Sequence, residues 1–495
     1  MHRFGLIAAG ALLPLSFAPF DVWPAAFVAV GLAFWLMQEV RDWRTGFFYG
    51  WLIGVGKYAV GASWIYVSIH EQGGASESLA SVLVGIFVAG MALFSALFGV
   101  LYSLLAPRNC APVLNVLVFA STWCVAEWTL TWLLTGFPWL FVGYGLMPTW
   151  LAGFAPVIGV FGLGFMTCLL AALAVAAGRG ANALRLVTVV LALALFAGGY
   201  GLGKVDWVVP GEPREVALVQ GNIEQITKWN PANRLPILQT YERLTEPHWG
   251  VDLIIWPEAA LTLFAQQAAP WLARWQERGV ATGTALVLGL PDVARADNAF
   301  QNTAHAVGAG SGRYVKRRLV PFGEYVPLES LLRGLIGFFD LPMSRSSPGA
   351  SQQLPLMAAD TRLGLAICYE IAYPELVRTS AASSDVLVTI SNDAWFGASI
   401  GPHQHLQLAR MRALENGRYV LRATNNGMTA IVNERGVVTT ALPQFEPGVL
   451  KGSYKPTTGL TPFTRMGDLP MLALFAGILV VGLIRRRWYI DAPVK

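Results

Sequence analysis

The chain has 495 residues, of which 55% are hydrophobic and 13% are charged, and its mean hydropathy is +0.50. Soluble globular proteins carry about 25% charged residues, so these figures are hard to reconcile with a water-soluble surface throughout. They also exclude a disordered chain, and four cysteines in this length exclude a small disulfide-rich scaffold. The net charge of +5 is positive, as expected of a protein that binds nucleic acid, but the distribution of Lys and Arg along the chain argues against such a partner.

Apolar segments dominate residues 1–203 and return at residues 466–484. Segments of about 20 apolar residues cross a bilayer as helices, because hydrocarbon offers the backbone no other hydrogen-bond partners. The first two segments are short and are expected to form a tight hairpin. We predict about eight transmembrane helices, at residues 4–20, 24–39, 45–67, 79–106, 112–134, 154–177, 185–203 and 468–484.

The domain boundaries follow from this pattern. Residues 1–203 are expected to hold transmembrane helices 1–7, residues 204–465 a globular insert, and residues 466–495 helix 8 with a tail. The N-terminal run also resembles a secretory signal peptide, but Pro14 breaks it and no small-x-small cleavage site follows.

Lysine and arginine residues in the short loops predict the orientation. If the N-terminal side is cytoplasmic, the external loops 68–78 and 135–153 contain none of these residues. Ten lie on the cytoplasmic side: Arg3, Arg41, Arg44, Arg108, Arg179, Arg185, Arg485, Arg486, Arg487 and Lys495. Both termini are therefore expected in the cytoplasm and the insert outside it. The other basic residues lie mostly in the insert, where acidic residues balance them, so no nucleic-acid partner is expected.

The insert has the composition of an ordinary globular domain. Runs of aliphatic and β-branched residues predict strands near 216–223, 252–256, 284–290, 302–308, 313–319, 362–368, 385–391, 419–424, 428–433 and 448–454. Helical patterns occupy 231–246, 268–278, 373–382 and 403–416. Strands that alternate with helices predict an α/β or α+β domain with both sheet faces covered.

Three reactive residues each stand at the end of a predicted strand: Glu258, Lys316 and Cys368. Singly, each has an ordinary explanation, as a solvated carboxylate, a basic strand edge or an inert buried thiol. Together, in this chain order, they resemble the nitrilase superfamily. The sequence motifs that carry the resemblance are Trp256-Pro-Glu258, Tyr314-Val-Lys316, Cys368-Tyr-Glu370 and Ser391-Asn-Asp-Ala-Trp-Phe396.

Helices on both sides of such a domain make the whole chain resemble the apolipoprotein N-acyltransferase family. Further sequence motifs similar to those of that family are Gln220-Gly-Asn-Ile223, Lys228-Trp229, Leu319-Val-Pro-Phe-Gly-Glu324-Tyr-Val-Pro327, Ser63-Trp-Ile-Tyr-Val-Ser-Ile-His70 and Asn425-Asn-Gly427. The resemblance implies a multi-pass α-helical membrane domain and a nitrilase-like αββα sandwich. It also implies residence in the bacterial inner membrane with the catalytic domain in the periplasm.

The resemblance further implies a reaction without a cofactor. The acyl donor is a phospholipid, and the acceptor is the α-amino group of the diacylglyceryl-Cys that begins an apolipoprotein. Glu324 is implied to orient Lys316 or the acid–base pair. Trp229, Tyr369 and Glu370 are implied as pocket or lid residues.

The chemistry of the three residues suits acyl transfer. A thiol with a pKa of ~8.5 needs a base, and Glu258 is the candidate if a dry pocket raises its pKa or matches it to that of the thiol. Lys316 and the backbone N–H of Tyr369 are candidates to stabilise the oxyanion. The expected product is an acyl thioester on Cys368, which an amine then attacks in a ping-pong cycle.

Other interpretations stay open at this point. The triad alone also fits a membrane-tethered amidohydrolase that releases ammonia and a free acid, and the helices alone fit a transporter, although no half-helix or inverted-repeat signal supports one. Lys57 and Glu127 fall inside predicted spans. The alternatives are a lipid headgroup or proton site, a structural pair with each other, or a Lys57 side chain that extends to the membrane interface. His403 and His405 match a metal pair only weakly, so no metal site is predicted.

Overall fold

The computed structural model describes residues 2–40, 42–107, 112–294, 299–327 and 345–490. Within this part the chain forms two compact units. We name them the helical unit (Met1–Tyr66, Glu77–Asp206 and Arg465–Lys495) and the sheet unit (Val67–Ser76 and Trp207–Thr464). Arg41, Arg108 and Lys495, which enter the predicted orientation, lie outside the described residues.

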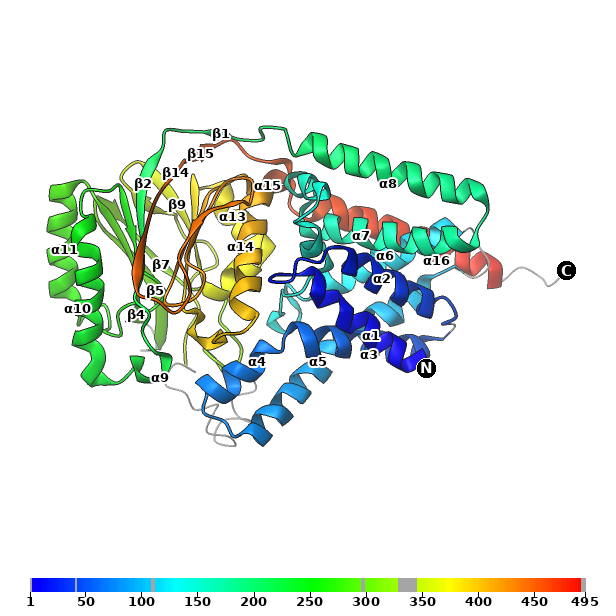
Figure 1. The fold of residues 1–495 in the computed structure, drawn as a ribbon, viewed down its shortest axis with the longest axis horizontal. Helices are drawn as coiled ribbons and strands as arrows, with labels where there is room; N and C mark the ends of the chain where they lie inside the picture. Colours follow the sequence, from blue (N-terminus) through cyan, green and yellow to red (C-terminus); the bar gives the residue numbers. More distant parts are fainter. Residues whose placement is uncertain (1, 41, 108–111, 295–298, 328–344, 491–495) are drawn as a thin grey trace. The chain divides into compact units, whose positions relative to one another are not determined.

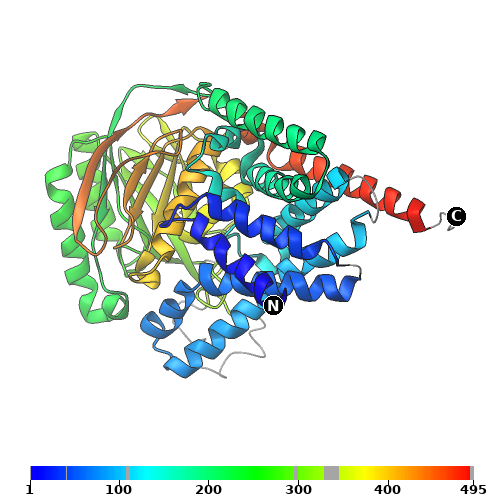
Figure 2. The same ribbon diagram turned by 45° about the vertical axis from the view of Figure 1, so that its right-hand side comes forward.

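The helical unit contains one described helix in each of the apolar segments that the sequence identifies (Figures 1 and 2). These helices are α1 (His2–Leu12), α2 (Pro24–Met37), α3 (Trp43–Gly61), α5 (Glu77–Leu105), α6 (Pro112–Thr129), α7 (Ala155–Arg179), α8 (Asn182–Leu202) and α16 (Leu469–Ile490). The short helix α4 (Trp64–Val67) follows α3, and α15 (Pro462–Met466) precedes α16.

The prediction of eight membrane spans is not confirmed. Among the described residues four helices are long and apolar enough to cross a bilayer: Glu77–Leu105, Trp150–Arg179, Asn182–Leu202 and Leu469–Arg486. A fifth is added if the bent pair Trp43–Gly61 and Trp64–Gln72 counts as one span. Helices α1 and α2 have 11 and 14 residues, which at 1.5 Å per residue fall short of a hydrocarbon core of about 30 Å.

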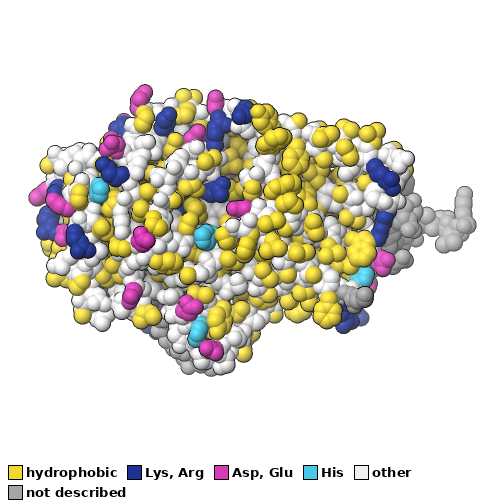
Figure 3. Space-filling view, viewed as in Figure 1, with side chains coloured by type: hydrophobic (Ala, Val, Ile, Leu, Met, Phe, Trp, Pro, Cys, Tyr) yellow, Lys and Arg dark blue, Asp and Glu magenta, His cyan; other side chains and the backbone are white. Residues whose placement is uncertain are grey.

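Helix α8 exposes many apolar side chains. Five large apolar side chains of this helix are more than half exposed: Leu186, Val187, Val189, Val190 and Leu193. Figure 3 shows a face of α8 that is almost continuously hydrophobic. An apolar surface of this extent on a single helix is typical of contact with lipid.

Close helix packing in this unit depends on small residues. Gly46, Gly50 and Gly54 recur at every fourth position of α3 and face α5. A Cβ atom at Gly50 would lie 2.3 Å from the carbonyl oxygen of Ser95 on α5. This small-residue spacing brings two backbones together, as is usual between helices in membranes.

The sheet unit contains two large β-sheets. Among the described residues one sheet has the strand order β13-β12-β11-β10-β9-β8-β6 and the other has the order β14-β2-β3-β4-β5-β7. The first contains β6 (Gly310–Ser311), β8 (Leu356–Ala358), β9 (Thr361–Ile367), β10 (Val386–Ser391), β11 (Val420–Thr424), β12 (Ala430–Val432) and β13 (Val438–Ala441). The second contains β2 (Arg214–Gln220), β3 (Leu253–Ile255), β4 (Ala285–Val293), β5 (Phe300–Gly308), β7 (Arg313–Val315) and β14 (Gly448–Tyr454). A separate short ribbon pairs β1 (Val209–Pro210) with β15 (Thr457–Thr458).

The two sheets pack face to face between two layers of helices. One apolar core joins residues of both sheets, such as Leu218 and Ile255 from one and Leu365 and Val388 from the other. A second core packs the outer face of the β2–β3–β4 sheet on α10 (Arg234–Thr245) and α11 (Ala269–Thr282). Helices α13 (Pro374–Ala382) and α14 (Gly401–Asn416) contact the other sheet, and the short α9 (Gln225–Lys228) follows β2 (Figure 1). The layers are therefore α, β, β and α.

One predicted strand ends earlier than the sequence indicates. A strand is predicted near 313–319, but β7 ends at Val315. Beyond it, the backbone N–H groups of Arg317 and Arg318 donate to the Glu370 carboxylate at 2.6 and 3.1 Å. A buried carboxylate here takes the hydrogen bonds that a neighbouring strand would otherwise provide.

Candidate active site

The carboxyl ends of strands from both sheets carry the residues of interest. In one sheet β3 and β4 are parallel, whereas β5 is antiparallel to β4 and β7 is antiparallel to β5, so β3 and β7 end at the same edge. Glu258 follows β3 and Lys316 follows β7. In the other sheet β9 and β10 are parallel, and Cys368 and Asn392 follow them. Strand direction therefore places each side chain.

Lys316 is shared by two carboxylates. Its Nζ lies 3.1 Å from Glu258 Oε1 and 2.9 Å from Glu324 Oε1. The Lys316 side chain is 1% exposed and each glutamate side chain is 8% exposed, so the three charges interact out of reach of bulk water. The structure thus brings together Glu258, Lys316 and Glu324, which the sequence motifs single out.

Two asparagines hold Glu258 in place, and sequence reasoning missed both roles. Asn302 Nδ2 donates to Glu258 Oε1 at 2.7 Å and to Glu324 Oε1 at 3.1 Å. The backbone N–H of Asn392 donates to Glu258 Oε2 at 2.8 Å. Asn302 lies within β5, and asparagine is depleted in strands, which is the signal that could have identified it.

The charges of this cluster govern its protonation. Burial would raise the pKa of Glu258, but the Lys316 ammonium and the hydrogen bonds from Asn302 and Asn392 outweigh it and lower that pKa. Burial would lower the pKa of Lys316, but Glu258 and Glu324 raise it well above its usual value. Glu258 therefore rests ionised and Lys316 rests charged, so a raised Glu258 pKa, one of the two conditions stated above, does not describe the resting site.

Cys368 stands at the turn that follows β9. Its backbone has φ of +54°, a left-handed conformation that is uncommon for a residue with a Cβ. The residue is only partly buried. Burial raises the pKa of its thiol, the Glu258 charge raises it further, and the Lys316 charge lowers it. The cysteine thus rests as a neutral thiol within electrostatic reach of both residues.

Glu370 ties the cysteine turn to the end of β7. Its carboxylate accepts the N–H of Ile367 at 2.7 Å and the hydroxyl of Tyr314 at 2.9 Å, besides the two β7-end N–H groups described above. Burial raises the pKa of Glu370, and its backbone donors oppose that shift. Tyr369 is 7% exposed, with its ring edge-on to Tyr373 at 5.3 Å.

Lys228 is the last residue of α9, and Trp229 follows it. Trp229 is half-buried, and its ring meets Phe300 edge-on at 6.2 Å. Lys228 is fully buried, and its Nζ donates to the main-chain oxygen of Glu258 at 3.4 Å. Burial lowers the pKa of Lys228 to about 8, although the Glu258 charge opposes this shift.

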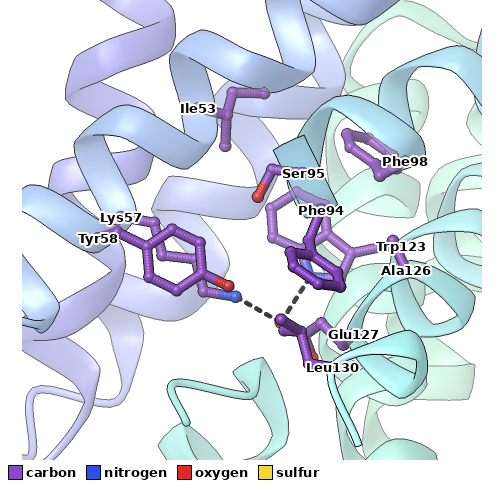
Figure 4. Close-up of a pocket in the computed structure, with 10 residues that line it drawn as sticks. All are labelled: Ile53, Lys57, Tyr58, Phe94, Ser95, Phe98, Trp123, Ala126, Glu127 and Leu130. Atoms are coloured by element: carbon purple, nitrogen blue, oxygen red, sulfur yellow. Dashed lines mark hydrogen bonds and ion pairs between the residues drawn. The ribbon is translucent and has the colours of Figure 1, made fainter. Parts of the chain in front are cut away.

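The predicted intramembrane residues Lys57 and Glu127 pair with each other in the helical unit. Lys57 Nζ lies 2.8 Å from Glu127 Oε1, and both side chains line a small pocket between helices (Figure 4). Glu127 also accepts from Trp123 Nε1 at 3.1 Å and from the N–H of Val142. The structure therefore shows that these two side chains pair with each other.

A metal site has no support from geometry. Within the described ranges no group of three or more His, Cys, Asp or Glu side chains is arranged to hold an ion. His405 lies with Nδ1 at 3.0 Å from Asp393 and Nε2 at 3.1 Å from the Cys368 carbonyl oxygen, so its ring nitrogens face protein groups.

The chain matches two family descriptions. Residues 215–459 match "Carbon-nitrogen hydrolase", and residues 9–173 match "Apolipoprotein N-acyltransferase N-terminal domain". Among solved structures, a nitrilase-superfamily protein of Saccharomyces cerevisiae (Nit3) is 18% identical, with a TM-score of 0.38 over 51% of this chain and 93% of that chain. An amidase of Nesterenkonia is 20% identical, with a TM-score of 0.36 over 54% and 97% of the two chains.

Curated relatives match far more closely and over nearly the whole length. The apolipoprotein N-acyltransferase of Azotobacter vinelandii is 45% identical over 98% of this chain and 96% of that protein. The enzymes of the same name from Pseudomonas aeruginosa and Methylococcus capsulatus are 43% and 39% identical, each over 97% of this chain and 95% of the relative. The chain therefore belongs to the apolipoprotein N-acyltransferase family.

Proposed function

We propose that this enzyme transfers a fatty acyl chain from a phospholipid to the α-amino group of the diacylglyceryl-Cys that begins an apolipoprotein. A thioester on Cys368 carries the chain between them. One observation carries the proposal: a partly accessible cysteine in a left-handed turn lies within electrostatic reach of a lysine that two buried carboxylates share. The proposed reaction uses groups of the protein itself and no cofactor.

The first half-reaction forms the thioester. Glu258 takes the thiol proton as Sγ attacks the ester carbonyl carbon, because the resting thiol is neutral and the resting carboxylate is ionised. The S–C bond forms, the bond from that carbon to the glycerol oxygen breaks, and Glu258 gives its proton to the departing oxygen. A lysophospholipid leaves.

Lys316 supplies the charge that the oxyanion needs. Its ammonium stays protonated throughout because Glu258 and Glu324 raise its pKa, so it is available when negative charge develops on the carbonyl oxygen. The backbone N–H of Tyr369 is the proposed second donor. Removing one such donor typically costs ~3 kcal/mol in the barrier.

The second half-reaction consumes the thioester. The acceptor amine attacks the same carbonyl carbon, Glu258 accepts the amine proton, the C–S bond breaks, and the proton returns to sulfur. An amide replaces a thioester, which is downhill, so no ATP is needed. Water must be kept from the thioester during the exchange of substrates.

The supporting residues act by position. Glu324 holds Lys316 through one oxygen and takes the N–H of Val320 at 2.8 Å through the other, so it fixes both the lysine and its own loop. Glu370 fixes the cysteine turn against the Lys316 strand end. Trp229 and Tyr369 are the proposed pocket aromatics that meet the acyl chain.

The proposed location is the bacterial inner membrane, with residues 1–203 and 466–495 forming eight segments and residues 204–465 in the periplasm. Arg3, Arg44, Arg179 and Arg185 support cytoplasmic loops and termini. The orientation does not require α1 and α2 to cross completely, because a two-helix hairpin that enters and returns preserves the parity of the later segments. A cysteine introduced at Glu212 should react with a membrane-impermeant maleimide in intact spheroplasts, and protection there until lysis would reverse the orientation.

The deciding experiment incubates the full-length enzyme with phospholipid vesicles alone. Mass spectrometry of the peptide that contains Cys368 should show the mass of one acyl chain in the wild type and none in Cys368→Ser. Addition of a diacylglyceryl-Cys peptide should then release an N-acyl peptide. Acylation that persists in the variant would exclude Cys368 as the nucleophile. Free fatty acid in place of the N-acyl peptide would identify a hydrolase instead.

A further inference from the structure

A buried cluster of ionisable side chains lies directly behind Cys368 and has no part in the mechanism above. It consists of Asp393 after β10, His405 in α14 and Arg422 in β11, and none of the three side chains is exposed. Arg422 Nη2 donates to Asp393 Oδ2 at 2.5 Å and lies 3.1 Å from His405 Nδ1. His405 Nε2 lies 3.1 Å from the carbonyl oxygen of Cys368. The cluster therefore reaches the backbone of the nucleophile itself.

The hydrogen-bond partners determine the tautomer of His405. Burial and the Arg422 charge lower the pKa of this histidine, so near pH 7 the ring is neutral and carries one N–H. A proton on Nδ1 would donate to Asp393 Oδ1, 3.0 Å away, but would leave the lone pairs of Nε2 and of the Cys368 carbonyl facing each other. A proton on Nε2 bonds to that carbonyl, and Arg422 then donates to Nδ1.

Asp393 is already occupied in this arrangement. Its Oδ1 accepts the hydroxyl of Ser391 at 2.7 Å and its Oδ2 accepts from Arg422. Although burial would raise the pKa of Asp393, the neighbouring Arg422 lowers it, so the carboxylate stays ionised and keeps Arg422 in place. With the proton on Nε2, the Cys368 carbonyl has a donor and Nδ1 accepts from Arg422, although Nδ1 also lies 3.0 Å from Asp393 Oδ1. The contact with Cys368 is a hydrogen bond only when Nε2 carries a proton.

The backbone that His405 contacts is strained. Cys368 has φ of +54°, which costs free energy in a residue with a Cβ and persists only where the surroundings fix it. We propose that His405 is a positioning residue, whose Nε2–H holds the Cys368 carbonyl oxygen and so keeps the left-handed turn that presents Sγ to Glu258 and Lys316.

The same strand end holds the base. Asn392, between Ser391 and Asp393, donates its backbone N–H to Glu258 Oε2 at 2.8 Å. Its side chain bonds to Gln225 at 2.6 Å and accepts from Asn425 at 3.1 Å. The end of β10 therefore contacts the Glu258 carboxylate through Asn392, and it contacts the Cys368 backbone through Asp393 and His405. This inference rests on the proposed function in taking Cys368 as the nucleophile.

Two amide substitutions separate positioning from general stability. In His405→Gln the side-chain amide nitrogen reaches the place of Nε2, whereas in His405→Asn it reaches only the place of Nδ1. His403→Asn, on the same helix and half-buried, is the matched control. Each full-length variant in detergent is treated with iodoacetamide in one arm and with phosphatidylethanolamine vesicles in the other. Mass spectrometry of the Cys368 peptide follows the rate in both arms.

We expect His405→Asn to slow alkylation and acylation roughly tenfold to hundredfold, because a buried carbonyl loses its donor. We expect His405→Gln to stay within about threefold of the wild type by the same reasoning, with the vesicle concentration for half-maximal rate unchanged. Wild-type rates in His405→Asn, or equal losses in both variants, would overturn the proposal. If His405→Asn does not fold, a hundredfold loss in folded His405→Gln overturns it, and rates near the wild type support it.

The two arms also separate this inference from the proposed function. If the wild type formed no acyl-enzyme on vesicles, the proposed function would fail. The iodoacetamide rates would still report whether His405 positions the thiol, because that arm contains no lipid substrate.

Discussion

Each unit contains a buried lysine–glutamate cluster, and the two clusters differ in their balance of charge. In the helical unit Lys57 faces one carboxylate at 2.8 Å, and Trp123 and Val142 occupy the oxygens of that carboxylate. In the sheet unit Lys316 faces two carboxylates, at 3.1 and 2.9 Å. One cation with one carboxylate is neutral, whereas one cation with two carboxylates carries an excess negative charge.

The difference matches two uses of the same groups. In a neutral pair whose carboxylate oxygens all accept hydrogen bonds, the side chains hold helices together, and no oxygen is left to accept a further proton. An excess carboxylate in a dry site is costly to keep, and such costs are typical of functional sites. That carboxylate is Glu258, which has a partly accessible thiol within electrostatic reach. The comparison therefore supports the proposal that the unbalanced cluster transfers protons, and it suggests that the balanced one packs helices.

The largest expected effect comes from neutralising one glutamate in each cluster. Glu258→Gln removes the base, so acyl-enzyme formation on phospholipid vesicles should fall about 1,000-fold or more while the thermal unfolding midpoint changes little. Glu127→Gln leaves the Lys57 ammonium buried without its counter-charge. It should lower the free energy of unfolding by about 3 kcal/mol and leave the acylation rate of the folded enzyme intact.

Crossed results would break the comparison. If Glu258→Gln formed the thioester at the wild-type rate, Glu258 would not be the base. If Glu127→Gln abolished acylation in a folded enzyme, the Lys57–Glu127 pair would belong to the chemistry and not to packing. Thermal unfolding and acyl-enzyme mass spectrometry on the same preparations distinguish these outcomes.

An intermediate effect should come from moving Glu258 without changing its charge. Gly289 in β4 lies under the turn that carries Glu258, and a Cβ there would lie 2.4 Å from the Pro257 oxygen and 2.8 Å from the Glu258 Cα. Both are backbone atoms that cannot rotate away. Gly289→Ala should displace the carboxylate and slow acyl-enzyme formation about 100-fold, because misplacement near 1 Å has that cost in aligned reactions.

The matched control is Gly448→Ala in β14 of the same sheet, where an added Cβ would meet Leu442 at an ordinary 3.8 Å. Its acylation rate should equal that of the wild type. A Gly289→Ala enzyme with the same rate as this control would show that the site tolerates a shifted Glu258, and the sharp geometry argued above would be wrong.

The sequence predicts several strands well because apolar runs leave a local signal. Such runs identify β2, β3, β9 and β10, and the candidates Glu258 and Cys368 stand where a predicted strand stops, whereas Lys316 falls inside the predicted strand 313–319. Loops at the carboxyl end of a buried strand carry polar side chains. The change from apolar to polar residues in the sequence therefore marks both the end of the strand and the candidate reactive residue.

Contacts between distant segments leave no such signal. Asn302 lies 44 residues from its partner Glu258, and Asn392 lies 134 residues from it, so their hydrogen bonds depend on sheet order. Membrane spans fail for another reason. Helices α1 and α2 are apolar but short, and hydropathy alone does not distinguish a helix that crosses from one that only enters.

The smallest expected effect concerns a third buried lysine, which has no carboxylate contact among the described residues. Burial lowers the pKa of Lys228 to about 8 from its ordinary 10.5, which corresponds to at most about 3 kcal/mol of cost to the charged form. Below pH 8 the folded and unfolded states both hold the proton, so the folded state bears this cost in full. Between pH 8 and 10.5 the unfolded state binds more protons, so stability rises with pH.

Lys228→Met should therefore stabilise the enzyme at pH 7 by about 1 to 2 kcal/mol, after relaxation around the charge is allowed for. It should also remove the rise in stability between pH 8 and 10.5 that thermal unfolding of the wild type shows. Lys451→Met, an exposed position on β14, should change neither quantity. If Lys228→Met were destabilised at pH 7, the charge of Lys228 would be favourable where it lies, and the cost inferred from its burial would be wrong.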